Sequence, residues 1–200
     1  MLITGIKSRP IYDHLAPILR ANRHLLVAQG SGGSAVARLL SEMGLSLAKT
    51  EVLYSTESFS GRSFAEEISR FPALKVRLFN TNEKAVEALD GLLSEAQIGT
   101  VLYLAGSETF IGRAMQIATK FDLKRDEVLR EHCGALARRI FCIHCNAYNE
   151  NVTHRVFRCQ ACGESLIVRD HDSRRLAAFM GVKADAETPG MLPPDEELDS

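Results

Sequence analysis

Residues 24–40 carry the strongest structural signal in the sequence and read HLLVAQGSGGSAVARLL. The first five of them form an apolar run of strand length, and a turn rich in glycine and serine follows at residues 30–34. Beyond the turn, apolar side chains recur at helical spacing on one face of a helix that Gly44 can end: Val36, Leu39, Leu40 and Met43. A strand, a tight turn and an amphipathic helix in this order predict the first unit of a parallel α/β sheet.

The same alternation continues to residue 134. Further strands are predicted at residues 51–55, 75–79, 100–104 and 128–129. Helices are predicted at residues 64–71, after Asn82 as a capping residue, and after Gly106 and Ser107, where apolar positions run from Phe110 to Phe121. We therefore expect an α/β fold, with a mostly parallel sheet and helices on both of its faces.

Composition excludes several classes of protein. The 200 residues are 46% hydrophobic and 24% charged, which argues against wholesale disorder and fibrous structure. With 24 basic and 25 acidic residues, the chain has no positive field that would draw it to nucleic acid or to an anionic membrane. The sequence lacks an apolar run of about 18 residues and a secretion signal, so we expect a cytoplasmic protein.

Three compositional zones predict the domain organisation. Residues 1–134 hold the α/β pattern, and residues 135–183 hold the cysteine pairs with eight basic and four acidic residues. Residues 184–200 contain six acids, three prolines and no base, so we expect a disordered tail.

The glycine turn at residues 30–34 opens a helix at the carboxyl end of a strand, where open α/β sheets bind ligands. Glycine lets the backbone approach an anion, and the free N–H groups of the first helical turn attract phosphate. The dinucleotide fingerprint is met in a relaxed form, with Ala35 in third place, and the P-loop pattern is absent. The same turn could equally be a tight connection without a ligand.

Residues 23–134 resemble the nicotinamide-binding module of the ferredoxin reductase superfamily, especially its phthalate dioxygenase reductase branch. The resemblance rests on residues 30–35, 54–58, 105–110 and 128–131. It implies that NAD(P)H would contact the following residues: Gly30, Ser31, Gly32, Gly33, Ser34, Ser55, Gly106 and Ser107.

The chain also departs from that branch. Ala105 stands in place of the family's cysteine, while Ala35 and Ser107 replace its two motif prolines. About 22 residues precede the first strand, too few for a flavin-binding barrel. The module would then hold NAD(P)H for a flavin on another subunit, or serve as a docking surface.

The two Cys-x-x-Cys pairs are the clearest chemical signal. They predict one tetrahedral metal site in a zinc-ribbon-like β domain of three strands, with these ligands: Cys142, Cys145, Cys159 and Cys162. Asn146 and Gly163 follow the pairs, and both residue types tolerate the positive φ that such turns need. Four thiolates suit structural Zn²⁺ and also a single electron-transferring iron, whereas the spacing is not that of a two-iron cluster.

Other candidate residues have simpler interpretations. We expect Cys133 to be a buried apolar thiol rather than a fifth ligand, and His144 and His154 to be exposed. The arginine pairs at 138–139 and 174–175 are expected to be solvated or to face a partner. The sequence gives no support for hydrolytic chemistry.

A nicotinamide-type module joined to a four-cysteine ribbon that ends in residues 159–182 resembles the DmmA-type small subunit of bacterial dimethylamine monooxygenase, and the resemblance spans nearly the whole chain. That resemblance implies a subunit of an enzyme that uses NAD(P)H and O₂ to demethylate dimethylamine to methylamine and formaldehyde. Flavin, haem and iron–sulfur centres would lie on companion subunits, and this chain would be inactive alone. A non-catalytic scaffold and, less favoured, a nucleic-acid-binding ribbon are the alternatives.

Overall fold

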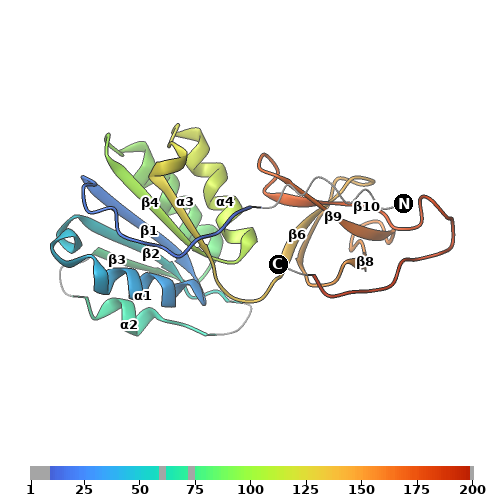
Figure 1. Ribbon diagram of the computed structural model, residues 1–200, viewed down its shortest axis with the longest axis horizontal. Coiled ribbons are helices and arrows are strands. Elements are labelled where there is room, and N and C mark those ends of the chain that lie inside the picture. Colours follow the sequence, from blue (N-terminus) through green and yellow to red (C-terminus); the bar gives the residue numbers. More distant parts are fainter. Residues whose placement is uncertain (1–9, 59–61, 72–74, 199–200) are drawn as a thin grey trace. The chain divides into compact units, whose positions relative to one another are not determined.

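The computed structural model describes residues 10–58, 62–71 and 75–198. The chain divides into two compact units, one spanning Tyr12–Ala135 and the other containing Leu136–Ser200. Figure 1 shows the helices confined to the first unit, while the second is built from strands.

The first unit is a parallel α/β sheet, as the sequence predicts. Its strands are hydrogen-bonded in the order β3-β2-β1-β4-β5, and every neighbouring pair is parallel. In chain order its elements are β1 (Arg23–Gln29), α1 (Gly32–Glu42), the 3₁₀ helix η1 (Gly44–Lys49), β2 (Thr50–Ser55), α2 (Ala65–Ser69), β3 (Lys75–Phe79), α3 (Asn82–Ser94), β4 (Thr100–Gly106), α4 (Glu108–Lys120), the 3₁₀ helix η2 (Arg125–Glu127) and β5 (Val128–His132).

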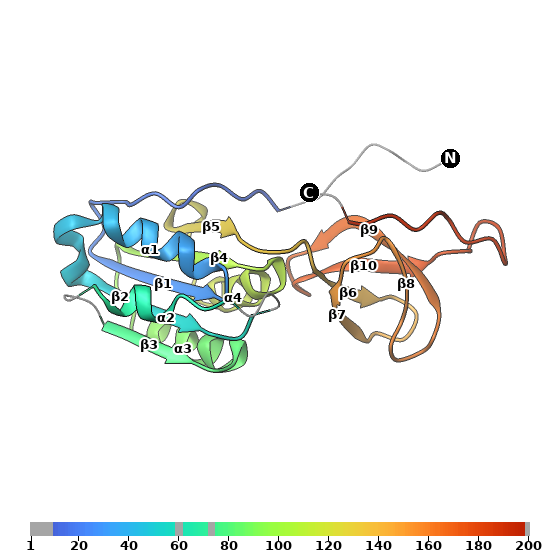
Figure 2. The ribbon, with the colours of Figure 1, turned by 90° about the horizontal axis from the view of Figure 1, so that it is seen from below.

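Helices cover both faces of this sheet (Figures 1 and 2). Successive strand residues point to opposite faces, so Leu26 and Ala28 of β1 share one core with α1 and α2. Leu25 and Val27 share the other core with α3 and α4. The predicted cap of α3 is displaced by one residue: Thr81, rather than Asn82, accepts a hydrogen bond from the Lys84 amide.

The segment before β1 is fastened to β5 by a buried carboxylate. Glu131 Oε2 accepts hydrogen bonds from the Leu15 amide at 2.7 Å and from Arg38 at 2.5 Å, while Oε1 lies 3.2 Å from His14. Burial opposes ionisation of Glu131, but the Leu15 amide and Arg38 outweigh it and hold its pKa below the ordinary value. The ionised carboxylate therefore stabilises the folded segment.

The second unit is a five-stranded sheet rather than the expected three-stranded ribbon. Its strands are β6 (Arg138–Cys142), β7 (Tyr148–Val152), β8 (Val156–Arg158), β9 (Ser165–Ser173) and β10 (Ala178–Lys183), in the order β7-β6-β10-β9-β8. Strand β10 joins the two halves because it pairs parallel to β6 and antiparallel to β9. A small core of Ile140, Val168 and Phe179 lies between them.

The arginine pair at 138–139, expected to be solvated or to face a partner, is instead held by groups of the second unit. Arg138 is 1% exposed, and its guanidinium lies 4.3 Å from the centre of the Phe179 ring and 3.7 Å from Asp170. Arg139 stacks on Tyr148 and pairs with Glu150 at 2.8 Å. Stacking on an aromatic ring and pairing with a carboxylate allow a guanidinium to be buried.

The acidic tail also differs from the expected disorder. The Leu198 amide donates to the Thr153 carbonyl at 2.8 Å, and the Arg155 amide donates to the Glu196 carbonyl at 2.8 Å. Leu198 packs with Val152 and Phe157 in the core of the second unit. The apolar side chain of Leu198 thus anchors this part of the acidic tail in the core of the second unit.

We predict that Glu131→Gln lowers the free energy of unfolding at neutral pH by about 1.5–3 kcal/mol, the range for a hydrogen bond to a charged group. Because the folded-state pKa is depressed, this contribution is complete above the unfolded value of about 4.5 and is lost as the pH falls through the folded value. Urea unfolding measured from pH 7 to pH 3 should show the difference in the free energy of unfolding between the wild-type protein and Glu131→Gln becoming smaller. The exposed carboxylate change Glu87→Gln is the control, and an equal gap at every pH would contradict the prediction.

Candidate functional site

Four cysteines from two turns converge in the second unit. Cys142 ends β6 and Cys145 lies in the turn after it, while Cys159 and Cys162 lie between β8 and β9. Their sulfur atoms lie within 4.8 Å of one another, with Cys142 to Cys162 at 3.9 Å and Cys145 to Cys159 at 3.7 Å. Within the described parts of the chain, no other group of three or more His, Cys, Asp or Glu residues gathers in this way.

The two turns have the same backbone geometry. The Cys142 amide donates to Ala147 and the Cys159 amide to Glu164, both at 2.9 Å. Asn146 and Gly163, each four residues after the first cysteine, donate back to that cysteine's carbonyl at 2.9 Å. Their φ angles of 63° and 73° confirm the predicted left-handed positions. Each turn therefore contributes two sulfur atoms, and the two turns face each other across the point where the four sulfurs meet.

The sulfur positions fit a tetrahedral metal ion. A metal–sulfur bond of about 2.3 Å in a tetrahedron places neighbouring sulfurs about 3.8 Å apart, close to the distances observed. Zn²⁺ and a single iron both satisfy this geometry with four thiolates. A shell of four protein ligands has no open position for O₂ or substrate.

The four thiols differ in acidity. Burial opposes ionisation of Cys159, but the backbone amides of Cys162 and Ala161 and the side chain of Asn149 lower its pKa to about 6. Burial raises the pKa of Cys142. The Glu164 amide lowers the pKa of Cys162, yet desolvation and the neighbouring cysteines outweigh it and raise that pKa to about 12. Thiols this close resist shared ionisation unless a cation joins them.

Of the other candidate residues, His144 and His154 lie where the sequence predicts, whereas Cys133 is half-buried rather than buried. His144 and His154 are exposed on the second unit. Cys133 follows β5 in the first unit and packs beside its core, where burial, followed by the Glu131 carboxylate, raises the pKa of the thiol to about 11. A thiol of that pKa is a poor nucleophile and a poor metal ligand at neutral pH.

The glycine turn lies at the carboxyl end of β1, as predicted. Other protein atoms fill the spaces where side chains on these glycines would lie. A Cβ on Gly30 would lie 2.6 Å from the Ser58 side chain, and one on Gly32 would overlap the Ala105 carbonyl. A Cβ on Gly33 would lie 2.5 Å from Phe64. The missing side chains are therefore required for close packing of α1 on β4 and β2.

The remaining predicted nucleotide contacts come together at the same edge and bond mainly to protein groups. Ser55 is buried and accepts a hydrogen bond from the Glu57 amide. The Ser107 amide donates to Gln29 Oε1 at 3.1 Å, and Gly106 packs against the same side chain. Nucleotide binding by these residues stays a prediction from the sequence.

Gln29 is a residue whose role the sequence pattern did not indicate. Besides its bond to Ser107, its Nε2 donates to the Glu57 carbonyl at 2.9 Å, so one amide joins the turns that follow β2 and β4. The sequence did offer one signal for this role. Gln29 directly precedes the glycines, and a carboxamide can donate and accept hydrogen bonds at the same time.

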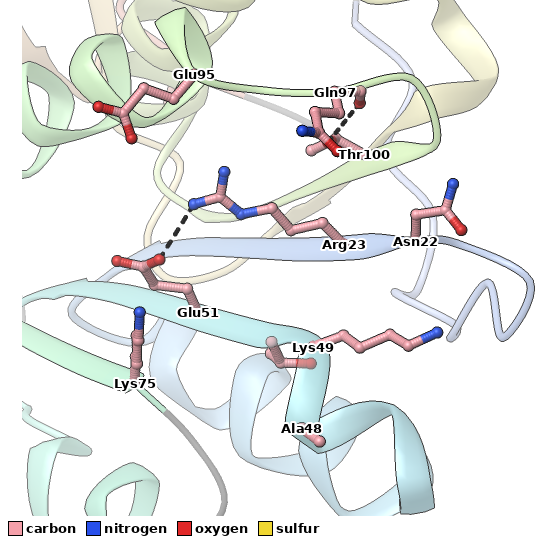
Figure 3. Close-up of a pocket in the computed structure, with 10 residues that line it drawn as sticks. Asn22, Arg23, Ala48, Lys49, Glu51, Lys75, Glu95, Gln97 and Thr100 are labelled. Carbon is pink, nitrogen blue, oxygen red and sulfur yellow. Dashed lines mark hydrogen bonds and ion pairs between the residues drawn. The ribbon is translucent and has the colours of Figure 1, made fainter.

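A hollow of about 620 Å³ lies at the opposite edge, where β1, β2, β3 and β4 begin (Figure 3). Arg23 and Glu51 point toward one another there at 3.2 Å, and Arg77 reaches the same carboxylate at 3.0 Å. The charge of Glu51 is thereby neutralised within the protein. The hollow is lined by Asn22, Arg23, Ala48, Lys49, Thr50, Glu51, Lys75, Glu95, Gln97 and Thr100.

Together, the parallel sheet and the four-cysteine centre define a protein with one α/β unit and one small metal-binding β unit. The chain belongs to the DmmA-like family of dimethylamine monooxygenase subunits. Residues 4–128 match the family's N-terminal domain and residues 139–182 match its C-terminal domain.

One curated relative is the heme-dependent oxidative N-demethylase delta subunit of Ectopseudomonas mendocina (strain ymp). It is 28% identical over 169 residues, which cover 84% of this chain and 83% of the relative.

Two solved structures are also similar. The ferredoxin reductase in carbazole 1,9a-dioxygenase has 16% identity and a TM-score of 0.47, over 56% of this chain and 36% of that one. Phthalate dioxygenase reductase has 17% identity and a TM-score of 0.44, over 67% and 46%. The chain thus spans less than half the length of either structure.

The described helices are also too short or too polar to cross a membrane.

The sulfur geometry predicts about one zinc or iron ion per chain, held in a closed four-thiolate shell. Cys159→Ser should lose this ion and unfold the second unit, because a core this small depends on the metal for its folding energy. Elemental analysis and near-ultraviolet circular dichroism measure the two effects. Cys133→Ser is the matched control and should keep the metal. A Cys159→Ser protein with a full complement of metal would contradict the assignment.

The packing at the glycine turn predicts that Gly32→Ala destabilises the α/β unit by about 1–3 kcal/mol, the usual cost of forcing an extra carbon into a packed site. Gly91, exposed on α3 with open space around it, is the matched control. Gly91→Ala should instead stabilise the protein by about 0.5–1 kcal/mol. Thermal unfolding of both variants without nucleotide measures these changes. A Gly32→Ala protein as stable as the wild type would show that the turn is not tightly packed.

Proposed function

We propose that this chain is a metal-holding assembly subunit of an oxidative N-demethylase that converts dimethylamine to methylamine and formaldehyde. The observation that carries the proposal is the family match, which extends over both units. A relative that aligns over 84% of this chain is the delta subunit of a heme-dependent oxidative N-demethylase, which supports a role beside other subunits.

The chemistry of the centre supports a role without direct catalysis. Oxidative demethylation needs an acceptor for electrons from NAD(P)H and a site where O₂ can bind a metal or flavin. The four cysteines form a closed shell, with Cys142 and Cys159 buried, so neither O₂ nor an amine has a ligand position there. We therefore assign the flavin, haem and iron–sulfur chemistry to companion subunits.

We assign Zn²⁺ to the centre, where it would supply folding energy to the second unit. The residues of this chain then hold the ion through four thiolates, and the two matching turns orient them. A single iron is the alternative, since it would add one-electron transfer between the subunits. Colour separates the two, because zinc thiolate centres are colourless and ferric thiolate centres are red.

For the α/β unit we propose an assembly role in place of nucleotide delivery. The hydrogen bonds of Gln29 to Ser107 and Glu57, and the filled spaces beside Gly30 and Gly32, support that choice. NAD(P)H binding by this unit is the competing function. Calorimetry of the assembled complex with NADH and NADPH, with and without this chain, distinguishes them.

The proposal predicts that this chain alone neither oxidises NAD(P)H nor releases formaldehyde from dimethylamine. Companion subunits mixed with the wild-type chain should show coupled turnover, and mixed with Cys159→Ser they should lose most of it. Formaldehyde release and NAD(P)H consumption measure this, with Cys133→Ser as the control that keeps turnover. Turnover by the isolated chain, or full turnover by the companions without it, would overturn the assigned role.

A further inference from the structure

A buried side chain outside the four cysteines donates a hydrogen bond to one of them. Asn149, on β7, is 1% exposed, and its Nδ2 donates a hydrogen bond to Cys159 Sγ at 3.6 Å. Its Oδ1 accepts a hydrogen bond from the Gln160 amide at 2.8 Å. Both ends of one buried carboxamide are thus used by the second cysteine turn.

The two bonds have separable roles. The bond to Gln160 joins β7 to the backbone of the turn that carries Cys159 and Cys162. The bond to Cys159 places an N–H dipole against the sulfur that would ligate the metal. Donors of this kind fix the orientation of a metal ligand and change how strongly it donates electron density.

Burial strengthens the hydrogen bond from Asn149 to Cys159. Cys159 is 3% exposed and Asn149 is 1% exposed, so water does not compete for the sulfur. Hydrogen bonds are stronger where the local dielectric is low, and an unpaired buried amide is costly. The amide is therefore held against Cys159 in a single arrangement.

We propose that Asn149 is a positioning residue of the metal centre, and that its N–H bond to Cys159 slows release of the metal. The inference rests on metal binding by the four cysteines and does not require the demethylase role. It also treats the bond as a modifier of the centre, which forms without it.

The test uses the full chain loaded with Co²⁺, whose charge-transfer bands report on sulfur donation. Asn149→Asp keeps an oxygen for the Gln160 amide and removes the N–H donor. Asn149→Ala removes both bonds without adding charge. Asn151→Asp makes the same chemical change at an exposed position of β7 and serves as the matched control.

If the N–H bond acts on the sulfur, both Asn149 variants release Co²⁺ to a chelator about ten- to a hundredfold faster than the control, the usual effect of losing such a partner. Their sulfur-to-cobalt bands also move to longer wavelength, because a sulfur without a hydrogen bond gives up electron density more easily. A purely structural clamp would leave the bands unmoved and spare Asn149→Asp.

The proposal is overturned by an Asn149→Asp protein whose bands and release rate equal those of the control. It is also overturned if neither Asn149 variant binds Co²⁺ while Asn151→Asp does, since the residue would then complete the centre rather than modify it. These readouts need no companion subunit, so they stand or fall independently of the demethylation assay.

Discussion

The second unit is organised around four sulfur atoms that lie within 4.8 Å of one another. Thiolates at that spacing repel each other unless a cation lies between them. Two of these cysteines, Cys142 and Cys159, form a core cluster with Leu166. We therefore expect metal binding and burial of that cluster to be one event.

The α/β unit depends on a different constraint, the close approach of chain segments at the carboxyl ends of its strands. Gly32 brings α1 onto the backbone of β4, and Gln29 joins the turns that follow β2 and β4. Neighbouring protein atoms fill the spaces where side chains on Gly30, Gly32 and Gly33 would lie. Close packing therefore accounts for these glycines, while nucleotide binding at the turn stays a prediction.

Local patterns in the sequence were sufficient to predict the α/β unit and the convergence of the four cysteines. The apolar runs of β1, β2 and β4, and the spacing of Cys142, Cys145, Cys159 and Cys162, are signals within short windows. Contacts between residues far apart in the sequence could not be predicted in this way.

Strand β6 begins with two arginines, and the aromatic ring that lets Arg138 be buried comes from Phe179, in β10. Leu198 lies in an acidic context, and its burial depends on Val152 and Phe157, far away in the chain. The contact of Asn149 with Cys159 likewise depends on how β7 folds back.

The central position of β10 has a consequence for how the protein is made. Strand β6 leaves the ribosome roughly forty residues before β10, its partner in the middle of the sheet. Both cysteine turns emerge in that interval, so the thiols reach solvent, oxidants and metal ions before the strand that joins the two halves emerges. The α/β unit has all its strands by His132 and can fold first, as domains in nascent chains generally do. Cellular metal supply and thiol redox state during translation would therefore bear on the yield of the second unit far more than on that of the first.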